Sequence, residues 1–501
     1  MMAGMLRALV PLALVSVLVA ATVIGVWHFA GARPDERDLV LYLGVLPLAT
    51  AIALLMAWRW QRTRARRRAD AAIVPTSPSL PMEAPAAATM LPDAPVDLLA
   101  AAVMLPIGGD AESAALALAQ SRRPGLHPQL RDAQGFPVLA AFVPDLDTEA
   151  AADALGSPSR VQADASGMPA DTAILRALAL LEPVADALLL RAYAPDTAAA
   201  IWQDPTTPYG NAHLLSAAKA APMLRVRLLL PAAWPQPARQ AATQWLVERA
   251  RMLGHAADAF TVESLPLADG METWRLIERL TATIAAEPHD ERHLLLATHS
   301  GIDARSIAAL SLQGALFDSR HPQASIPGEG AAGALLAART DPAEAPVLRL
   351  HRCVHAAHAD GTRSRDAVLR TGELIQRALD TAAQPADRVR ALVSDADHRA
   401  TPATHIAAAT AAVFPDLEPL HDCLPLGVSC GDTGIAAPLI ALAMAHARAL
   451  RDDAPAMVIG TDGRSARVAL VVSPAAVRDD VAAGQLHPQG TQQNHRDAMT
   501  S

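Results

Sequence analysis

The chain has 501 residues, of which 51% are hydrophobic and only 3% aromatic, and its formal charge is −9 at neutral pH. This length allows a membrane anchor together with one or two domains that have a sizeable core. The net negative charge argues against nucleic acid as a partner. Three cysteines, Cys353, Cys423 and Cys430, are too few for a disulfide framework in a chain of this size, which suggests a reducing compartment.

Two apolar stretches without charged residues open the chain, at residues 8–30 and 39–58. A helix rises about 1.5 Å per residue, so each stretch is long enough for a hydrocarbon core of about 30 Å. The first stretch alone could be a secretory signal peptide, but cleavage would leave the second unexplained. The sequence therefore predicts a two-span membrane anchor over residues 1–68.

Basic residues indicate how this anchor is oriented. Five arginines lie within residues 62–68, directly after the second span, whereas Arg33 and Arg37 between the spans are accompanied by three acidic residues. Basic flanks stay on the cytoplasmic side, so both termini should be cytoplasmic. Residues 69–97 are rich in Pro and Ala and lack apolar periodicity, which predicts an extended linker between the anchor and the remainder.

From Leu98 onward, short apolar runs alternate with longer amphipathic segments. The runs expected to form strands are LLAAAVMLPIG, PVLAAFV, ALLLRAY, LRVRLLLP, RHLLLATH, GALLAA, VRALVSD, AMVIGTDG and RVALVVS. Apolar spacing of three and four predicts helices over ARQAATQWLVERARML, GMETWRLIERLTATIAA, SRDAVLRTGELIQRALDTA and a segment starting near Gly434. This alternation predicts an α/β fold in which helices cover a mixed sheet. We expect an N-terminal α/β portion over residues 98–257, a core over residues 258–480 and a disordered tail over residues 481–501.

Two motifs suggest chemistry but fit it poorly. In ATHSGID, Thr298 stands where the nucleophile elbow of a serine hydrolase requires glycine. His351, Cys353 and His355 alternate along a presumed strand and would share one face, yet they match no standard zinc site. A polar edge strand is the preferred interpretation of this triplet, with a metal site as the alternative.

Four stretches in the second half follow one another in a distinctive order: SIPGEGAAGALLAA (325–338), ALVSDADHRATPATHIAAA (391–409), SCGDTGIAAPLIALAMA (429–445) and AMVIGTDGRSARVALVVS (456–473). In this order they resemble the landmarks of the thiolase-like condensing enzymes, and in particular the ketoacyl synthases. The similarity covers about residues 258–474. It implies a thiolase-like soluble domain with mixed sheets covered by helices.

The resemblance also shows where catalytic groups ought to lie. Condensing enzymes use a thiolate as the nucleophile and two polar partners, commonly histidines. The nucleophile should come just before the helix that starts near Gly270, where the chain has no cysteine and only Ser264 has nucleophilic character. The first histidine motif is replaced by VSDAD, with His398 beyond the turn, and Asp432 stands at the second. A carboxylate would repel the enolate that it should stabilise.

Two interpretations of the turn before the last helix stay open. Asp432 or Thr433 could cap that helix, with Cys430 as an inert core residue. Alternatively, four residues could form a recast active site; these vestigial-site candidates are Asp395, Asp397, Cys430 and Asp432. We prefer the structural role, and expect no catalytic activity and no cofactor.

The layout also resembles the type VI lipase adaptor proteins, formerly a domain of unknown function. This resemblance rests on SRRPGLHPQLRDAQGFPVLAAFVPDLD (121–147), on VSCGDTGIAAPLIALAMAHA (428–447) and on the two apolar stretches. It implies a protein of the bacterial inner membrane that binds a phospholipase effector and hands it to the spike protein of the secretion machine. The segment 98–240, sheet edges and helix faces would contact the partner. An acyltransferase or condensing enzyme is the alternative, and the fold resemblance also allows a homodimer.

Overall fold

The computed structural model describes residues 94–155, 172–193, 222–339, 348–357, 364–462 and 466–475. The chain divides into two compact units, Met1–Thr89 and Met90–Ser501, and every described residue belongs to the second. The expected membrane spans, their basic flank, most of the linker and the tail lie outside the described residues. Within the described part of the chain, no helix has the length and apolar character that a membrane crossing needs.

The first half of the described unit runs from β1 to β7. Its elements are β1 (Val96–Met104), α4 (Ala111–Ala119), β2 (Gly125–Arg131), β3 (Pro137–Ala140), α5 (Glu149–Ala154), α6 (Thr172–Tyr193), β4 (Met223–Pro231), α8 (Gln236–Met252), β5 (Phe260–Leu267), α9 (Gly270–Ala286), β6 (Glu291–Ser300), α10 (Ala304–Leu312) and β7 (Glu329–Ala337). β1 begins inside the expected linker, because Val96 and Asp97 are already buried in the sheet and Asp97 pairs there with Arg349.

The second half runs from β8 to β13. Its elements are β8 (Leu348–Leu350), β9 (Val354–Ala357), α11 (Ser364–Ala382), the short 3-10 helix η3 (Ala386–Arg388), β10 (Ala391–Ser394), α12 (Ala400–Val413), β11 (Cys423–Pro425), α13 (Leu426–Cys430), a second 3-10 helix η4 (Gly434–Ala436), α14 (Ala437–Asp452), β12 (Ala456–Asp462) and β13 (Ala466–Pro474).

The two halves share one topology. In the first, the strand order is β5-β4-β6-β7, with β4 parallel to both of its neighbours and β7 antiparallel to β6. In the second, the order β11-β10-β12-β13 repeats the same directions. β1 pairs with both β7 and β8 and so joins the halves into one 11-stranded sheet. The expected boundary at residue 257 falls within this sheet, since β4 pairs with β5 across it from Leu224 to Pro231.

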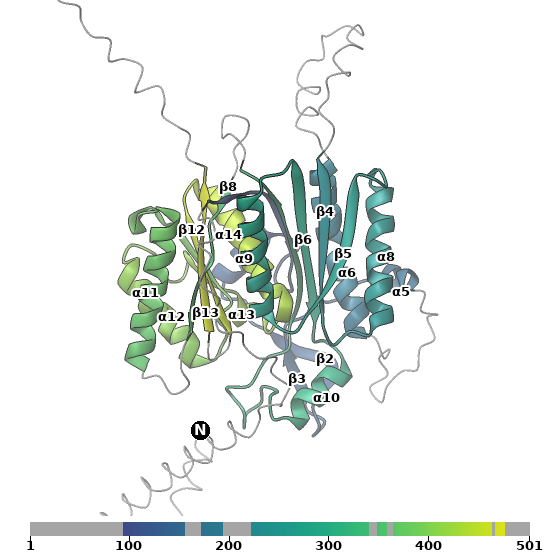
Figure 1. The fold of residues 1–501 in the computed structure, drawn as a ribbon. Coiled ribbons are helices and arrows are strands. Elements are labelled where there is room, and N and C mark those ends of the chain that lie inside the picture. Colours follow the sequence, from purple (N-terminus) through teal and green to yellow (C-terminus); the bar gives the residue numbers. More distant parts are fainter. Residues whose placement is uncertain are drawn as a thin grey trace, which may run out of the picture. The chain divides into compact units, whose positions relative to one another are not determined.

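Successive layers of helices cover the strands, as Figure 1 shows: α9 and α14 lie in the middle, α6 and α8 on one outer side, and α11 and α12 on the other. Alternate residues of a strand point to opposite faces. Leu228 of β4 accordingly packs with the outer helices α6 and α8, whereas Leu229 packs with the central helices. In β12, Val458 faces the central layer and Ile459 faces α11 and α12.

The expected helices after Pro235 are confirmed, and so are eight of the nine expected strands, although β3 is shorter than PVLAAFV. The run ALLLRAY is the exception, because it forms the end of the helix α6. The buried residues of α6 recur at helical spacing, for example Leu181, Ala185 and Leu188. A short apolar run does not by itself distinguish a buried strand from a buried helix.

Candidate functional site

The carboxyl ends of the parallel strands in both halves meet the starts of the central helices. β5 ends at Leu267 and α9 begins at Gly270, while a turn at residues 431–434 leads through η4 into α14. A Cβ atom on Gly270 would lie 3.4 Å from the carbonyl oxygen of Gly434. The two central segments therefore start against each other. Ligands of α/β sheets commonly gather at the carboxyl ends of the strands, so the candidate site lies here.

The start of α9 presents a carboxylate, a glycine and a buried methionine. The Asp269 carboxylate caps the helix by accepting a hydrogen bond from the Glu272 backbone N–H at 2.9 Å, and Gly270 and Met271 follow. Ser264 does not lie at this helix start. It sits inside the edge strand β5, opposite Leu228 of β4. The place where a thiol was expected thus holds no cysteine, serine or threonine.

Asp395 directly follows β10 and is bound to the end of β12. The backbone N–H and the hydroxyl of Thr461 both donate to its carboxylate, at 2.8–2.9 Å. Burial raises the pKa of Asp395 to about 7, against the opposing effect of these hydrogen bonds. The structure therefore gives this predicted site residue a carboxyl group that titrates near neutral pH.

Asp397 and His398 diverge beyond the same strand. The Asp397 carboxylate is 2.7 Å from the guanidinium of Arg399 and also accepts the Arg399 backbone N–H. The His398 ring packs edge-on against Phe317, with 5.0 Å between ring centres. Neither ring nitrogen of His398 has a hydrogen-bond partner in the described part of the chain. His398 therefore faces the loop that carries Phe317.

Asp432 organises the turn that precedes the last central helix. One carboxylate oxygen accepts the Ser325 hydroxyl at 3.1 Å and the other accepts the Gly434 backbone N–H at 3.0 Å. The side chain of Thr433 caps nothing, and η4 separates this turn from α14. The expected cap is thus only partly right, because Asp432 satisfies one backbone N–H of the turn and does not start α14 itself.

The loop at residues 315–328 is clamped onto this turn. The Asp432 backbone N–H donates to the carbonyl oxygen of Ile326 at 2.8 Å. A Cβ atom on Gly328 would lie only 2.1 Å from the carbonyl oxygen of Cys430. Gly431 has a φ of 65°, which favours glycine. Gly328 and Gly431 therefore let two backbone segments, about a hundred residues apart in sequence, lie in direct contact.

His299 also lies at the candidate site, although no sequence motif indicated it. It lies near the end of β6, and a Cβ atom on Gly434 would come within 2.6 Å of its Nδ1 atom. Burial lowers the pKa of His299, and nearby carboxylates, chiefly that of Asp432, act in the opposite direction. Nδ1 is buried without a hydrogen-bond partner among the described residues. The sequence signal that could have identified His299 is its position at the carboxyl end of a buried strand, where α/β sheets commonly bind ligands.

The neighbouring Ser300 is engaged in a buried polar cluster. Its hydroxyl donates to Glu329 at 2.8 Å, and the same carboxylate binds the Arg176 guanidinium through two hydrogen bonds and the Val143 backbone N–H through another. Glu329 is fully buried. With its hydroxyl bound in this way, Ser300 is not presented as a nucleophile.

The thiols are poor nucleophiles. Cys430 is buried, and burial raises the pKa of its thiol to about 12. Partial burial raises the pKa of Cys423 to about 11, and full burial also raises the pKa of Cys353. Since the thiolate is the reactive form, none of the three is activated at neutral pH.

The structure separates the three residues considered as weak metal candidates. The His351 Nε2 atom bonds to the Ser473 hydroxyl at 2.9 Å, whereas His355 Nε2 lies 2.8 Å from a Glu278 carboxylate oxygen. Cys353 packs into the central hydrophobic core. β9 begins only at Val354, so the three do not alternate along one strand. Among the described residues, no three His, Cys, Asp or Glu side chains are grouped to hold a metal ion.

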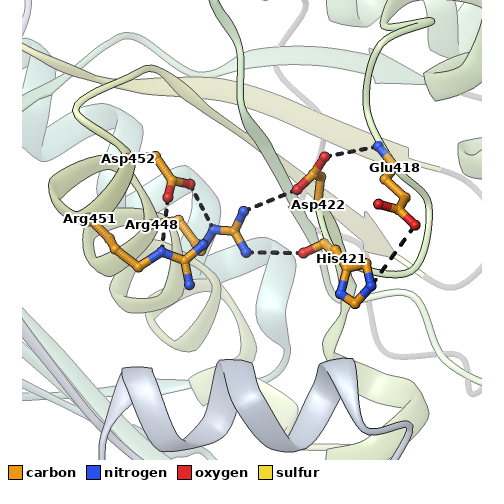
Figure 2. A network of polar contacts seen from close by, with 6 residues as sticks. All are labelled: Glu418, His421, Asp422, Arg448, Arg451 and Asp452. Carbon is orange, nitrogen blue, oxygen red and sulfur yellow. Dashed lines mark hydrogen bonds and ion pairs between the residues drawn. The ribbon is translucent and has the colours of Figure 1, made fainter.

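A second polar cluster lies at the far end of α14, as Figure 2 shows. Arg448 donates to Asp452, to Asp422 and to the carbonyl oxygen of His421, and Arg451 also binds Asp452. The cluster borders a surface depression of about 510 Å³ next to α4. Because Arg448 is already paired with two carboxylates, the cluster serves to hold the loop before β11 against α14.

The sequence matches no family model and no curated protein. Among solved structures, it is similar to a type II polyketide ketosynthase in complex with its acyl-carrier protein, at 11% identity and a TM-score of 0.51, covering 77% of this chain and 100% of that chain. The ishigamide ketosynthase/chain length factor is 16% identical, with a TM-score of 0.47 and coverage of 76% and 100%. A β-ketoacyl synthase from Burkholderia phymatum is 12% identical, with a TM-score of 0.45 and the same coverage.

At these identities the likeness concerns the fold alone. The chain has the α/β thiolase-like fold of the ketoacyl synthases, with a mixed sheet covered by helices.

Proposed function

We propose that this protein is a catalytically degenerate member of the thiolase-like fold that acts as a protein-binding adaptor. The observation that carries the proposal is the start of α9, where Asp269, Gly270 and Met271 stand in place of a nucleophile. A condensing enzyme needs a thiolate at the start of this helix to accept the acyl group. A capping carboxylate there cannot take that role.

The turn before α14 supports the same proposal. Asp432 places a negative charge where condensing enzymes stabilise a developing negative charge. Both of its oxygens accept hydrogen bonds within the protein, from Ser325 and from Gly434. These contacts favour a structural role for the turn.

The partner follows from the sequence resemblance to the type VI lipase adaptors. We propose a phospholipase effector and a spike protein of the secretion machine as the bound proteins. The two apolar stretches at residues 8–30 and 39–58 would hold the protein in the bacterial inner membrane, with its soluble unit and both termini in the cytoplasm. A surface for such a client would lie on the soluble unit.

An acyltransferase or condensing enzyme with a recast site is the second candidate. It is favoured by Asp395, because a carboxyl group with a pKa of about 7 can act as an acid or a base at neutral pH. The high pKa of the Cys430 thiol argues against it.

Affinity purification of the full-length protein from its native cells tests the two candidates. Wild type is compared with a Cys430→Ala, Asp432→Ala double variant, and bound proteins are identified by mass spectrometry. We expect the effector or the spike protein with both forms. Recovery of neither, together with an acyl carrier or an acyl adduct that the folded double variant loses, would replace the adaptor with the enzyme.

A further inference from the structure

The hairpin β2–β3, the helix α10 and the loop at residues 315–328 form a small unit beside the carboxyl end of β6 (Figure 1). Its own hydrophobic core consists of Leu130, Val138, Ala140, Ile302, Ile307 and Leu316. The backbone N–H of Ala133, in the hairpin turn, lies 3.4 Å from the hydroxyl of Ser311 near the end of α10. The hairpin is thus fixed to the rest of the unit.

This unit exposes three large apolar side chains. Leu126 is 65% exposed, Phe136 64% and Leu312 85%. Exposed apolar residues that gather on one small unit mark an interaction surface more often than scattered ones do. The hairpin is also a two-stranded sheet, separate from the main sheet. These features make the small unit the strongest candidate for a binding surface.

A depression of about 260 Å³ opens between the hairpin and residues 316–320; we call it the hairpin pocket. Apolar side chains that line it include Leu126, Phe136, Leu139 and Phe317. Sites for drug-sized ligands and cofactors usually measure about 300–1,000 Å³. The hairpin pocket is smaller, and its size suits one large side chain of a protein partner. Such anchors often dominate the affinity of protein interfaces.

Arg320 is the charged residue at the hairpin pocket whose side chain has no partner among the described residues. Asp132 and Asp318 also line it, but their carboxylates accept backbone N–H groups of their own turns. Arg320 is exposed, and within the described residues its guanidinium makes no hydrogen bond or ion pair. A partner with an acidic residue next to its apolar anchor would complement this pattern.

We propose that the hairpin pocket docks a protein partner through one large apolar side chain, with a neighbouring carboxylate of the partner paired to Arg320. The inference rests on the proposed adaptor function and names the surface that the client uses. Phe317 links this surface to the segment that follows β10, because it lines the pocket and its ring also packs against His398.

The test uses the full-length protein and measures its affinity for the phospholipase effector and for the spike protein. We expect Phe136→Ala and Arg320→Glu each to weaken binding of the effector at least about tenfold, and a loss confined to the spike protein would overturn the assignment. Leu369→Ala is the matched control, since Leu369 is 56% exposed on α11, away from the hairpin. It should bind within about twofold of wild type. A photo-cross-linking residue at position 136, but not at position 369, should capture the same partner.

The outcomes separate the docking surface from the adaptor function. If wild type binds a partner and both hairpin variants bind it equally well, the docking surface is wrong and the adaptor function stands. If wild type binds neither protein, the adaptor function fails and the docking surface with it. Self-association of wild type that Phe136→Ala abolishes would identify a second copy as the occupant and overturn the proposed partner.

Discussion

The three carboxylates at the carboxyl edge of the second half each accept hydrogen bonds from a neighbouring segment. Thr461 donates to Asp395, Arg399 to Asp397, and Ser325 to Asp432. Residues that were candidates for catalysis on sequence alone therefore have contacts that explain them as parts of the fold.

Asp395 should make the stability of the soluble unit depend on pH. Its pKa is raised to about 7 in the folded protein from an ordinary value of 3.8, so the folded state binds the proton more tightly. Stability should then fall as pH rises from about 4 to about 7, by up to about 4 kcal/mol, and change little from this group outside that range. Urea unfolding of wild type and Asp395→Asn across this range measures the effect. An equal pH slope in the two proteins would contradict it.

The cysteines should react slowly while the protein is folded. Burial raises the pKa of Cys430 to about 12 and that of Cys423 to about 11, so little thiolate exists at pH 7.5. Treatment with iodoacetamide followed by mass spectrometry should label Cys423 slowly and leave Cys430 and Cys353 unlabelled until urea is added. Fast labelling of native Cys430 would instead indicate an activated nucleophile and favour the enzyme alternative.

At the scale of elements, close backbone contacts join the loop at residues 315–328 to the turn before α14. This loop pairs with the turn through Pro327 and Asp432, and Ala141 after β3 donates to Pro327 as well. Three segments from distant parts of the chain thus meet at Pro327. Gly328 allows the closest of these approaches.

Replacement of Gly328 by alanine should separate the loop from the turn. The added Cβ atom would lie 2.1 Å from the Cys430 carbonyl oxygen, and backbone on both sides must shift. We expect a loss of at least about 2 kcal/mol in the free energy of unfolding. Gly125→Ala is the control, because its Cβ atom would meet nothing within 4 Å. Equal unfolding midpoints for the two variants would show that the contact does not matter.

At the scale of the whole molecule, the two equivalent halves are fused through their strands and central helices. β1 of the first half pairs with β8 of the second, and α14 of the second half packs on β1 and β7 of the first. The buried ion pair of Asp97 with Arg349 also joins the halves. Neither half keeps its core covered without the other.

A fragment covering residues 90–501 should therefore unfold in one cooperative transition. Calorimetry should give equal calorimetric and van't Hoff enthalpies, as expected for a single cooperative unit. Residues 90–339 expressed alone should not fold, because they lack β8 and α14. Two resolved transitions would show that the halves are independent domains.

The sequence by itself determined the type and order of eight strands and of the helices α8, α9, α11 and α14, because apolar periodicity is a local property of the chain. It also determined that no thiol precedes α9 and that Asp432 stands before the last helix. The tertiary structure decided features that depend on contacts between distant segments. It made ALLLRAY a helix, placed Ser264 on an edge strand, brought Gly328 onto Cys430 and set His299 against Gly434. These outcomes depend on packing between segments far apart in sequence, which no single stretch specifies.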